Sequence, residues 1–250
     1  MVELIKGNCH GGFLTMTIKQ NILTIQKKIE DAVQRRTAME TRENDVEIIA
    51  VTKTQPTDFI SEALKCGIKT IGENRVQEAL EKYNFFRTEE ADIIWHLIGH
   101  LQTNKAKQAV EMFDLIHSID SERLAVAVNS AANKIDKVQN ILVQVNIGEE
   151  DSKFGLAPNF NEVHLLVRAI SELENLHLCG LMTIAPYYED SEKTRPIFRE
   201  LKKMFDELKL LNIHNIDLKW LSMGMTQDYI VAVEEGANMV RIGTGIFGER

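Results

Sequence analysis

Apolar and polar positions along the chain follow two different periods. Ile18, Ile22, Ile25, Ile29 and Val33 recur at helical spacing, which predicts an amphipathic helix near the start. After this helix, short apolar runs typical of strands alternate with longer segments of helical period. The strand-like runs cover residues 47–52, 68–74, 93–99, 115–119, 140–148, 177–185, 218–224 and 238–243.

Strict alternation of strands and helices predicts a parallel sheet. Eight such units in 250 residues match the size of a closed α/β barrel of the (β/α)₈ or TIM type, with one extra N-terminal helix. The alternative is an open doubly wound sheet, which a glycine-rich dinucleotide fingerprint would favour, but none follows the first strand. We expect a poorly ordered extension over residues 1–15 and one barrel domain over residues 16–250, because no linker composition divides the chain.

Local signals mark several helix ends. Asp58 is the expected N-terminal cap of the helix after the first strand, and Gly67 stands where that helix should end. Ser121 is placed to cap the helix after the fourth strand, and Gly236 to close the helix after the seventh.

The composition is that of an ordinary globular domain and narrows the choice of partners. A net charge of −8 at pH 7 gives no general attraction to nucleic acid or to an anionic membrane. No apolar run has the length of a membrane span, and the N-terminus lacks the pattern of a secretory signal. The scattered Cys9, Cys66 and Cys179 suggest a reducing compartment, without a disulfide framework or a zinc site. We expect a cytoplasmic protein.

The segment "IIAVTKTQP" places a lysine directly after the first predicted strand. In a (β/α)₈ barrel the carboxyl ends of the strands form the mouth that carries the active site, so Lys53 should face this mouth. A partly desolvated lysine amine can form a Schiff base with an aldehyde or a ketone. The alternative is a lysine that pairs with a phosphate or lies at the surface.

Two segments near the end of the chain have the features of anion-binding loops. The segment "WLSMGMTQD" places Ser222, Gly224 and Thr226 where the seventh strand turns into its helix, so that backbone N–H groups can face an anion. In "VRIGTGIFG", a Gly-Thr-Gly sequence follows closely after Arg241. The loops after strands seven and eight are the recurrent phosphate site of this fold. The alternatives are a tight turn capped by Thr226 and an arginine paired with a protein carboxylate.

Two further polar positions lie at predicted strand ends. His96 and His100 are four residues apart, but on a strand and the following loop, so they lack the shared helical face of a zinc pair and we expect no metal site. His96 either contacts a ligand or is a hydrogen-bonded core histidine. Asn74, in "GENRVQE", either caps the next helix or contacts a ligand.

Taken in order, six segments closely resemble the pyridoxal phosphate homeostasis proteins, which are one-domain relatives of the N-terminal barrel of alanine racemase. The segments are "VTKTQP", "GENRVQE", "WHLIGHLQTNK", "GLMTIAP", "LSMGMTQD" and "VRIGTGIFG". The resemblance extends from about residue 18 to residue 250. It implies a fold-type III barrel that binds pyridoxal 5′-phosphate (PLP).

The resemblance also implies roles for individual residues. It makes Lys53 the residue that binds PLP covalently as a Schiff base, and Arg241 the partner of the pyridine nitrogen. The implied phosphate cradle consists of Ser222, Met223, Gly224, Gly243 and Thr244. The implied ring pocket is lined by Asn74, His96 and Met182. Thr226 stands where many members have serine, and "DSKFGL" (residues 151–156) resembles a family loop to which we assign no role.

An arginine at the pyridine nitrogen bears on the chemistry that is expected. A guanidinium only donates hydrogen bonds and stays charged, so it disfavours protonation of the ring, and a neutral ring is a poorer electron sink. In alanine racemase, to which the resemblance extends, two bases compensate for this poorer electron sink: a lysine and a tyrosine from a second domain. We do not expect such a second domain in this chain. Of its tyrosines, Tyr83, Tyr187, Tyr188 and Tyr229, only Tyr187 and Tyr188 lie in a loop that could approach the mouth.

The favoured hypothesis is a non-enzymatic carrier or buffer of PLP without catalytic residues. It would hold the cofactor on its lysine and pass it to apo-enzymes, and so contribute to vitamin B6 and amino-acid homeostasis. The alternatives are a PLP-dependent amino-acid racemase and a cofactor-free Schiff-base aldolase, although an aldolase leaves the two anion loops unexplained. We expect a monomer whose partners are PLP and PLP-dependent apo-enzymes.

Overall fold

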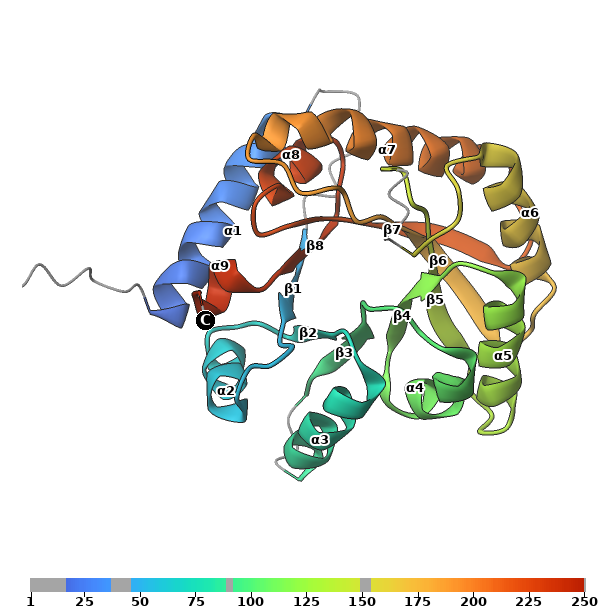
Figure 1. The fold of residues 1–250 in the computed structure, drawn as a ribbon, viewed down its shortest axis with the longest axis horizontal. Helices are drawn as coiled ribbons and strands as arrows, with labels where there is room; N and C mark the ends of the chain where they lie inside the picture. The colour runs from blue at the N-terminus through green and yellow to red at the C-terminus, as the bar shows by residue number, and fades with distance from the viewer. Residues whose placement is uncertain (1–16, 37–45, 89–91, 149–153, 250) are drawn as a thin grey trace, which may run out of the picture.

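A computed structural model of the chain describes residues 17–36, 46–88, 92–148 and 154–249. Eight parallel strands pair in sequence order and close into a barrel, which confirms the predicted fold (Figure 1). The strands are β1 (Glu47–Val51), β2 (Thr70–Glu73), β3 (Ile94–Leu97), β4 (Leu115–Ile119), β5 (Gln139–Gln144), β6 (Leu176–Met182), β7 (Ile216–Met225) and β8 (Met239–Ile242).

Helices surround the barrel and connect successive strands (Figure 1). They are α1 (Ile18–Gln34), α2 (Thr57–Lys65), α3 (Val76–Arg87), α4 (Ala106–Met112), α5 (Glu122–Asn133), α6 (Phe160–Ser171), α7 (Arg195–Leu210), α8 (Tyr229–Glu234) and α9 (Thr244–Phe247), with short 3₁₀ helices η1 (Thr103–Lys105) and η2 (Ser191–Thr194). Within the described residues, no helix is both long enough and apolar enough to cross a membrane.

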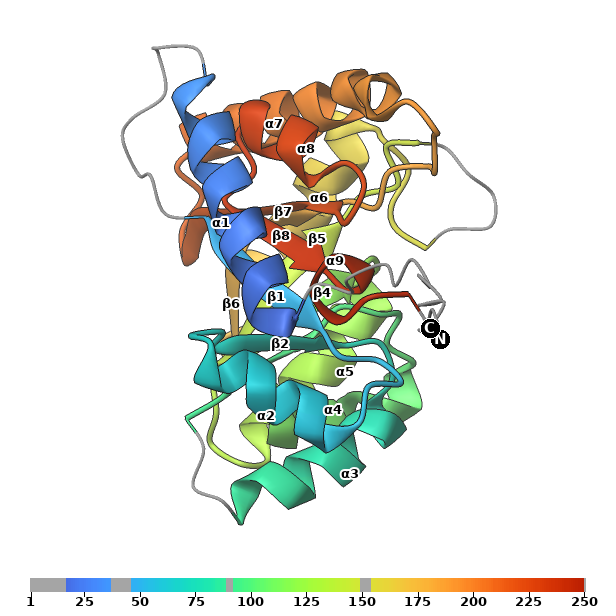
Figure 2. The ribbon, with the colours of Figure 1, turned by 90° about the vertical axis from the view of Figure 1, so that its left-hand side faces the viewer.

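The extra N-terminal helix α1 packs against α2, α8 and α9, on the side where β1 meets β8 (Figure 2). Its first turn is held by a capping box, in which Gln20 N donates to Thr17 Oγ1 at 3.2 Å and Thr17 N donates to Gln20 Oε1 at 2.9 Å. The predicted apolar face is confirmed, since its buried residues include Ile18, Ile22, Ile25 and Ile29.

The closing seam of the barrel joins the first and last strands. Ile49 on β1 lies opposite Arg241 on β8 and opposite Thr70 on β2. Residues that follow β1 therefore lie beside those that follow β8, although almost the whole chain separates them in sequence. This arrangement brings the predicted lysine and the predicted C-terminal anion loop to the same part of the mouth.

The buried apolar side chains form two layers. The larger layer lies between the strands and the helices. A second cluster consists of Ile49, Leu115, Leu142, Cys179, Met182 and Met239. These residues come from β1, β4, β5, β6 and β8. Because side chains alternate between the two faces of a strand, we assign this cluster to the inside of the barrel, below the mouth.

Several expected boundaries differ from the observed ones. The strand β5 ends at Gln144 and β6 ends at Met182, earlier than expected. One backbone hydrogen bond follows each end, from Val145 N to Met182 O at 2.9 Å and from Thr183 N to Ser222 O at 3.1 Å. Asp58 is not the N-cap of α2: the cap is Pro56, which makes no side-chain hydrogen bond, and Asp58 lies in the first turn. Ser121 does cap α5, by accepting a hydrogen bond from Leu124 N.

Glycines end two helices as expected. Gly67 follows α2 with φ of 95° and Gly236 follows α8 with φ of 101°, conformations that glycine adopts without steric cost. Cys66 and Cys179 are free thiols. The expectations for residues 1–15, and for the first half of "DSKFGL", concern positions outside the described residues.

Candidate functional site

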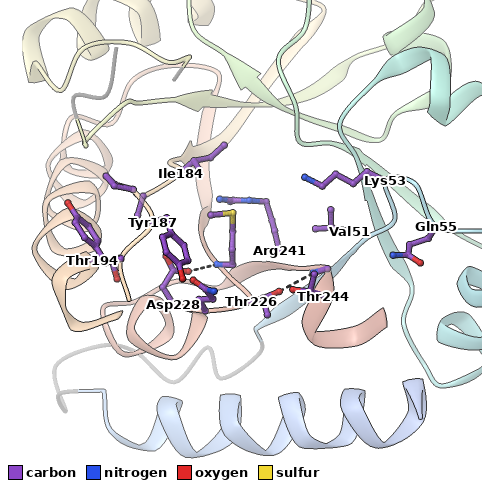
Figure 3. Close-up of a pocket in the computed structure, with 16 residues that line it drawn as sticks. Val51, Lys53, Gln55, Ile184, Tyr187, Thr194, Thr226, Asp228, Arg241 and Thr244 are labelled. Carbon is purple, nitrogen blue, oxygen red and sulfur yellow. Dashed lines mark hydrogen bonds between the residues drawn. The ribbon is translucent and has the colours of Figure 1, made fainter. Parts of the chain in front are cut away.

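A cavity of about 430 Å³ opens at the mouth of the barrel (Figure 3). Its walls come from the ends of β1, β7 and β8, from the loop after β6 and from η2. Among the residues that the sequence indicated for lysine and anion chemistry, five share this cavity: Lys53, Thr226, Arg241, Gly243 and Thr244. The barrel mouth therefore brings together the predicted lysine, the predicted arginine and residues of both predicted anion loops.

Lys53 lies in a tight turn that leaves β1. Gln55 N donates to Thr52 O at 2.9 Å, and Thr54 has a positive φ of 60°, as in the third residue of a type II turn. Figure 3 shows the side chain of Lys53 extending across the cavity toward Arg241. The side chain is exposed, so the protein alone does not supply the partial desolvation that was expected of it.

Three charged residues form a cluster against this turn, and we call them the Lys82 triad: Lys82, Glu73 and Glu78. The Nζ atom of Lys82 lies 2.7 Å from Glu73 Oε1 and 2.8 Å from Glu78 Oε1. Lys82 and Glu73 are buried. Burial raises the pKa of Glu73, and the hydrogen bond from Lys82 opposes this effect. None of the three residues lines the cavity.

Arg241 is buried at one side of the cavity. Its Nη1 donates to Ser222 Oγ at 2.6 Å and its Nη2 donates to Thr183 O at 2.7 Å. These partners are a hydroxyl and a carbonyl rather than the protein carboxylate that was the alternative. Burial lowers the pKa of Arg241 to about 10 and the charge of Asp228 opposes this shift, so the guanidinium remains charged at neutral pH.

A line of buried polar groups continues from Arg241 into the barrel. His117 Nδ1 lies 3.1 Å from Ser222 Oγ, and His117 Nε2 lies 3.1 Å from His96 Nδ1. Burial lowers the pKa of His96 to about 3 and lowers the pKa of His117 well below its ordinary value, so both rings are neutral. His96 lines a second cavity of about 320 Å³ at the other end of the barrel.

The hydrogen-bond roles in this line follow from the guanidinium, which can only donate. Ser222 Oγ accepts from Arg241, and its own hydroxyl is then free to donate to His117 Nδ1. The remaining proton of His117 lies on Nε2 and is donated to His96 Nδ1. In this assignment each hydrogen bond of the line has one donor and one acceptor, and the proton of His96 lies on Nε2.

The hydroxyl that faces the cavity from β7 belongs to Thr226. Its Oγ1 accepts hydrogen bonds from Gly243 N and from Gly245 N, both at 3.3 Å. Thr226 thus joins the loops after β7 and β8, and its hydroxyl proton remains to be donated to an anion. Ser222, in contrast, is buried in the line of polar groups and does not line the cavity.

Gly224 packs closely against α8. It has φ of 92°, and a Cβ at this position would lie 2.6 Å from Ala232 Cβ and 2.9 Å from Tyr229 Cα, both on α8. The preceding residue, Met223, is fully buried in the larger layer between the strands and the helices. Of the two methionines in this segment, Met225 lines the cavity and Met223 does not.

The three residues predicted for the ring pocket do not line the mouth cavity. Met182 is buried inside the barrel, and His96 faces its opposite end. Asn74 lies beyond β2, where its carbonyl oxygen is 2.2 Å from a Cβ built on Gly99. Asn74 does not cap α3 either, because the N-cap of α3 is Arg75 without a side-chain hydrogen bond.

His96 and His100 are not brought together. His100 stacks on Phe154 with ring centroids 3.7 Å apart, and its Nδ1 lies 3.9 Å from Asp120 Oδ2. In the part of the chain that the structure describes, no group of three or more acidic, histidine or cysteine side chains could hold a metal ion.

Sequence reasoning missed the Lys82 triad and His117. Lys82 stands four residues after Glu78 on a predicted helix, a spacing that usually marks a solvated ion pair. His117 interrupts the apolar run "LIHSI", and a polar residue inside a buried strand was the available signal. Tyr187 and Tyr188, expected only to approach the mouth, do line the cavity.

The closed eight-stranded barrel and the cavity at its mouth place this protein in the class of alanine racemase-like barrels. The family model for the alanine racemase N-terminal domain matches residues 18–250. An alanine racemase of Clostridium difficile has the same fold, with a TM-score of 0.68 and 18% identity over 92% of this chain and 57% of that chain. At this identity the likeness concerns the fold alone.

Closer relatives define the family within this class. A pyridoxal phosphate homeostasis protein of Aquifex aeolicus is 46% identical over 83% of this chain and 89% of its own length. The structure of PipY from Synechococcus elongatus with PLP bound has a TM-score of 0.78 and 33% identity, covering 93% of this chain and 100% of that chain. The chain belongs to the family of pyridoxal phosphate homeostasis proteins.

Proposed function

We propose that this protein binds PLP as a Schiff base on Lys53 and holds it for PLP-dependent apo-enzymes, and so contributes to PLP and amino-acid homeostasis in the cytoplasm. The observation that carries the proposal is the placement of Lys53 and Arg241 in one cavity, together with Thr226, Gly243 and Thr244 from the two predicted anion loops. The names of the relatives and the PLP-bound structure of PipY support it.

The residues of the cavity fit each end of the cofactor. The amine of Lys53 would attack the aldehyde carbon, forming a C=N bond and releasing its oxygen as water. Arg241 would donate to the pyridine nitrogen, held in place by Ser222 and Thr183. Thr226, Gly243 and Thr244 would hold the phosphate. We therefore assign the phosphate-binding hydroxyl to Thr226 instead of Ser222, which does not line the cavity.

Arg241 also bears on whether turnover is expected. Bound PLP supplies an electron sink for carbanions, most effectively when its ring nitrogen is protonated. Arg241 remains charged at neutral pH and has no proton acceptor, so it keeps that nitrogen neutral. The relatives are named homeostasis proteins rather than enzymes, which agrees with a holding role without strong catalysis.

A racemase is the second candidate, favoured by one observation. Tyr187 and Tyr188 line the same cavity as Lys53, and a tyrosine could act as the second base. Tyr187 is 70% exposed, however, so burial among the described residues does not fix its hydroxyl near a reacting carbon. We therefore favour the PLP-holding role over the racemase. We also propose that the protein is a monomer, which is the simplest state for that role.

The deciding experiment is trapping of the lysine. The protein is incubated with PLP, reduced with borohydride and digested, and mass spectrometry locates the modified residue. The expected adduct is on Lys53 and is lost in Lys53→Arg, which keeps the positive charge but cannot form the C=N bond. Absence of any adduct and of a visible absorbance band would refute the proposal. Rapid exchange of the α-proton of an L-amino acid in deuterated water, with loss of optical rotation, would favour the racemase.

A further inference from the structure

The Lys82 triad contacts the backbone on both sides of Lys53. Lys82 Nζ donates to Thr52 O at 2.6 Å, and the Thr52 hydroxyl donates to Glu73 Oε1 at 2.5 Å. On the other side of Lys53, Thr54 N donates to Glu78 Oε1. Both neighbours of the lysine are therefore bonded to one connected set of charged groups.

These contacts act on a backbone conformation that is unfavourable by itself. Thr54 has φ of 60°, which is uncommon for any residue except glycine and is a genuine outlier for a β-branched one. Its N–H is fixed by a carboxylate, and a hydrogen bond to an ionised group is stronger than one between neutral groups. The triad thus supplies the surroundings that keep this turn in one conformation.

The triad links two elements to the turn. Glu73 ends β2, whereas Glu78 and Lys82 lie one helical turn apart on α3. Glu73 is fully buried, and its Oε2 has no hydrogen-bond partner among the described residues, so its charge depends on Lys82. A group of this kind is costly to bury, and a protein that only needed to join β2 to α3 could do so with apolar side chains.

We propose that Glu73, Glu78 and Lys82 are positioning residues for Lys53, which fix the turn so that the amine enters the cavity in one orientation. This inference rests on the proposed function, because it concerns the rate and strength with which Lys53 captures PLP. A misplacement of a reacting group by about 1 Å can cost roughly 100-fold in rate. Loss of the triad should therefore slow capture without removing the lysine.

The matched test uses two substitutions at Glu78, which is only partly buried and lies on the first turns of α3. Glu78→Gln removes the charge but keeps a side-chain oxygen for Thr54 N, whereas Glu78→Ala removes both. Capture is followed by the growth of the visible band after mixing with PLP, and the adduct on Lys53 is counted after borohydride reduction. Urea unfolding of the PLP-free protein measures the stability of each variant.

Under this inference Glu78→Ala captures PLP roughly 10- to 100-fold more slowly than the wild type, and Glu78→Gln stays within a few-fold of it. Both variants lose the ion pair to Lys82, so a purely structural role would change the stability and the capture rate of both alike. Lys82→Met should slow capture further, and Lys202→Met, which breaks the pair with Asp206 at 2.7 Å on α7, is its control.

Two outcomes separate this inference from the proposed function. If the wild type captures PLP on Lys53 and folded Glu78→Ala does so at the same rate, the positioning role is wrong and the proposed function stands. If the wild type itself forms no adduct on Lys53, the proposed function is wrong, and the inference is overturned together with it. A folded Glu78→Gln variant as slow as Glu78→Ala would also overturn the positioning role of the hydrogen bond to Thr54.

Discussion

The two neutral histidines inside the barrel make the stability of the fold sensitive to acid. His96 and His117 share a hydrogen bond and both are almost fully buried. Burial lowers the pKa of His96 to about 3, against an ordinary value of 6.5, and lowers the pKa of His117 well below that value. The perturbation that tests this is His96→Asn, because the amide oxygen of asparagine can take the acceptor role of Nδ1 toward His117.

The direction in which stability changes with pH follows from the lowered pKa values of the two histidines. Each histidine binds a proton in the unfolded chain below about pH 6.5 but stays neutral in the folded protein, so the stability present above pH 6.5 is lost as the pH falls toward 3. The loss is about 1.4 kcal/mol per pH unit for each such group. Between pH 7 and pH 5 it amounts to about 2 kcal/mol for His96, and His117 contributes a loss in the same direction.

The assay is urea unfolding of the PLP-free protein at pH 7 and at pH 5. His96→Asn removes one of the two groups, so its free energy of unfolding should fall by about 2 kcal/mol less than that of the wild type over this interval. His214→Asn, at an exposed histidine outside the line, is the control for the chemical change itself. Parallel losses in the wild type and in His96→Asn would refute the reasoning, because His96 would then not be a neutral buried group.

Three further predictions concern Gly224, Thr226 and Ser222, on β7 and the loop that follows it. Gly224→Ala should destabilise the protein by about 2–5 kcal/mol, since it adds the cost of a positive φ to that of overpacking against α8. Gly67→Ala, with a similar φ of 95° but nothing within 4 Å of its added Cβ, should cost only the backbone part, about 1–2 kcal/mol, and equal losses in urea unfolding would contradict the packing role of Gly224. Thr226→Val should weaken PLP binding by about 1.5–3 kcal/mol, roughly 10- to 150-fold in Kd by titration of the visible band, whereas Thr226→Ser should bind normally. Ser222→Ala should instead lower the stability of the PLP-free protein by about 1–3 kcal/mol, because it leaves Arg241 and His117 each short of a buried partner; a stable Ser222→Ala variant would contradict the polar line.

The fold was predictable because each of its elements carries a local signal. The alternating periods predicted eight strands in their observed order. Eight strand–helix units in a chain of this length match the size of a closed barrel. Strand ends were less predictable, since Ile147 is buried like the residues of β5 but lies in a turn beyond the strand. Burial alone does not distinguish a paired strand from a packed loop.

The site was predictable to the level of the segment but less well to the level of the residue. Four of the residues predicted to bind PLP line the mouth cavity. Two others, Ser222 and His96, instead lie below the cavity, where both are hydrogen-bonded to His117. Side chains of a strand alternate between two faces, and the bulge in the pairing of β7 with β8, between Ser222 and Met225, shifts that alternation. The sequence contains no sign of the shift, so it does not indicate whether a hydroxyl of this segment lies in the cavity or below it.

The seam between β1 and β8 makes the cavity depend on closure of the barrel. Lys53 follows β1, Arg241 lies on β8, and these strands pair with each other directly. A ligand that bonds to both sides of the seam binds only the closed barrel, and it therefore stabilises the fold by RT ln(1 + [L]/Kd), about 2.7 kcal/mol at a ligand concentration 100 times Kd. PLP should thus raise the midpoint of urea unfolding in the wild type, and Lys53→Arg should reduce this gain because it removes the bond on the β1 side. An unchanged gain in Lys53→Arg would mean that the cofactor is held from the β7 and β8 side alone.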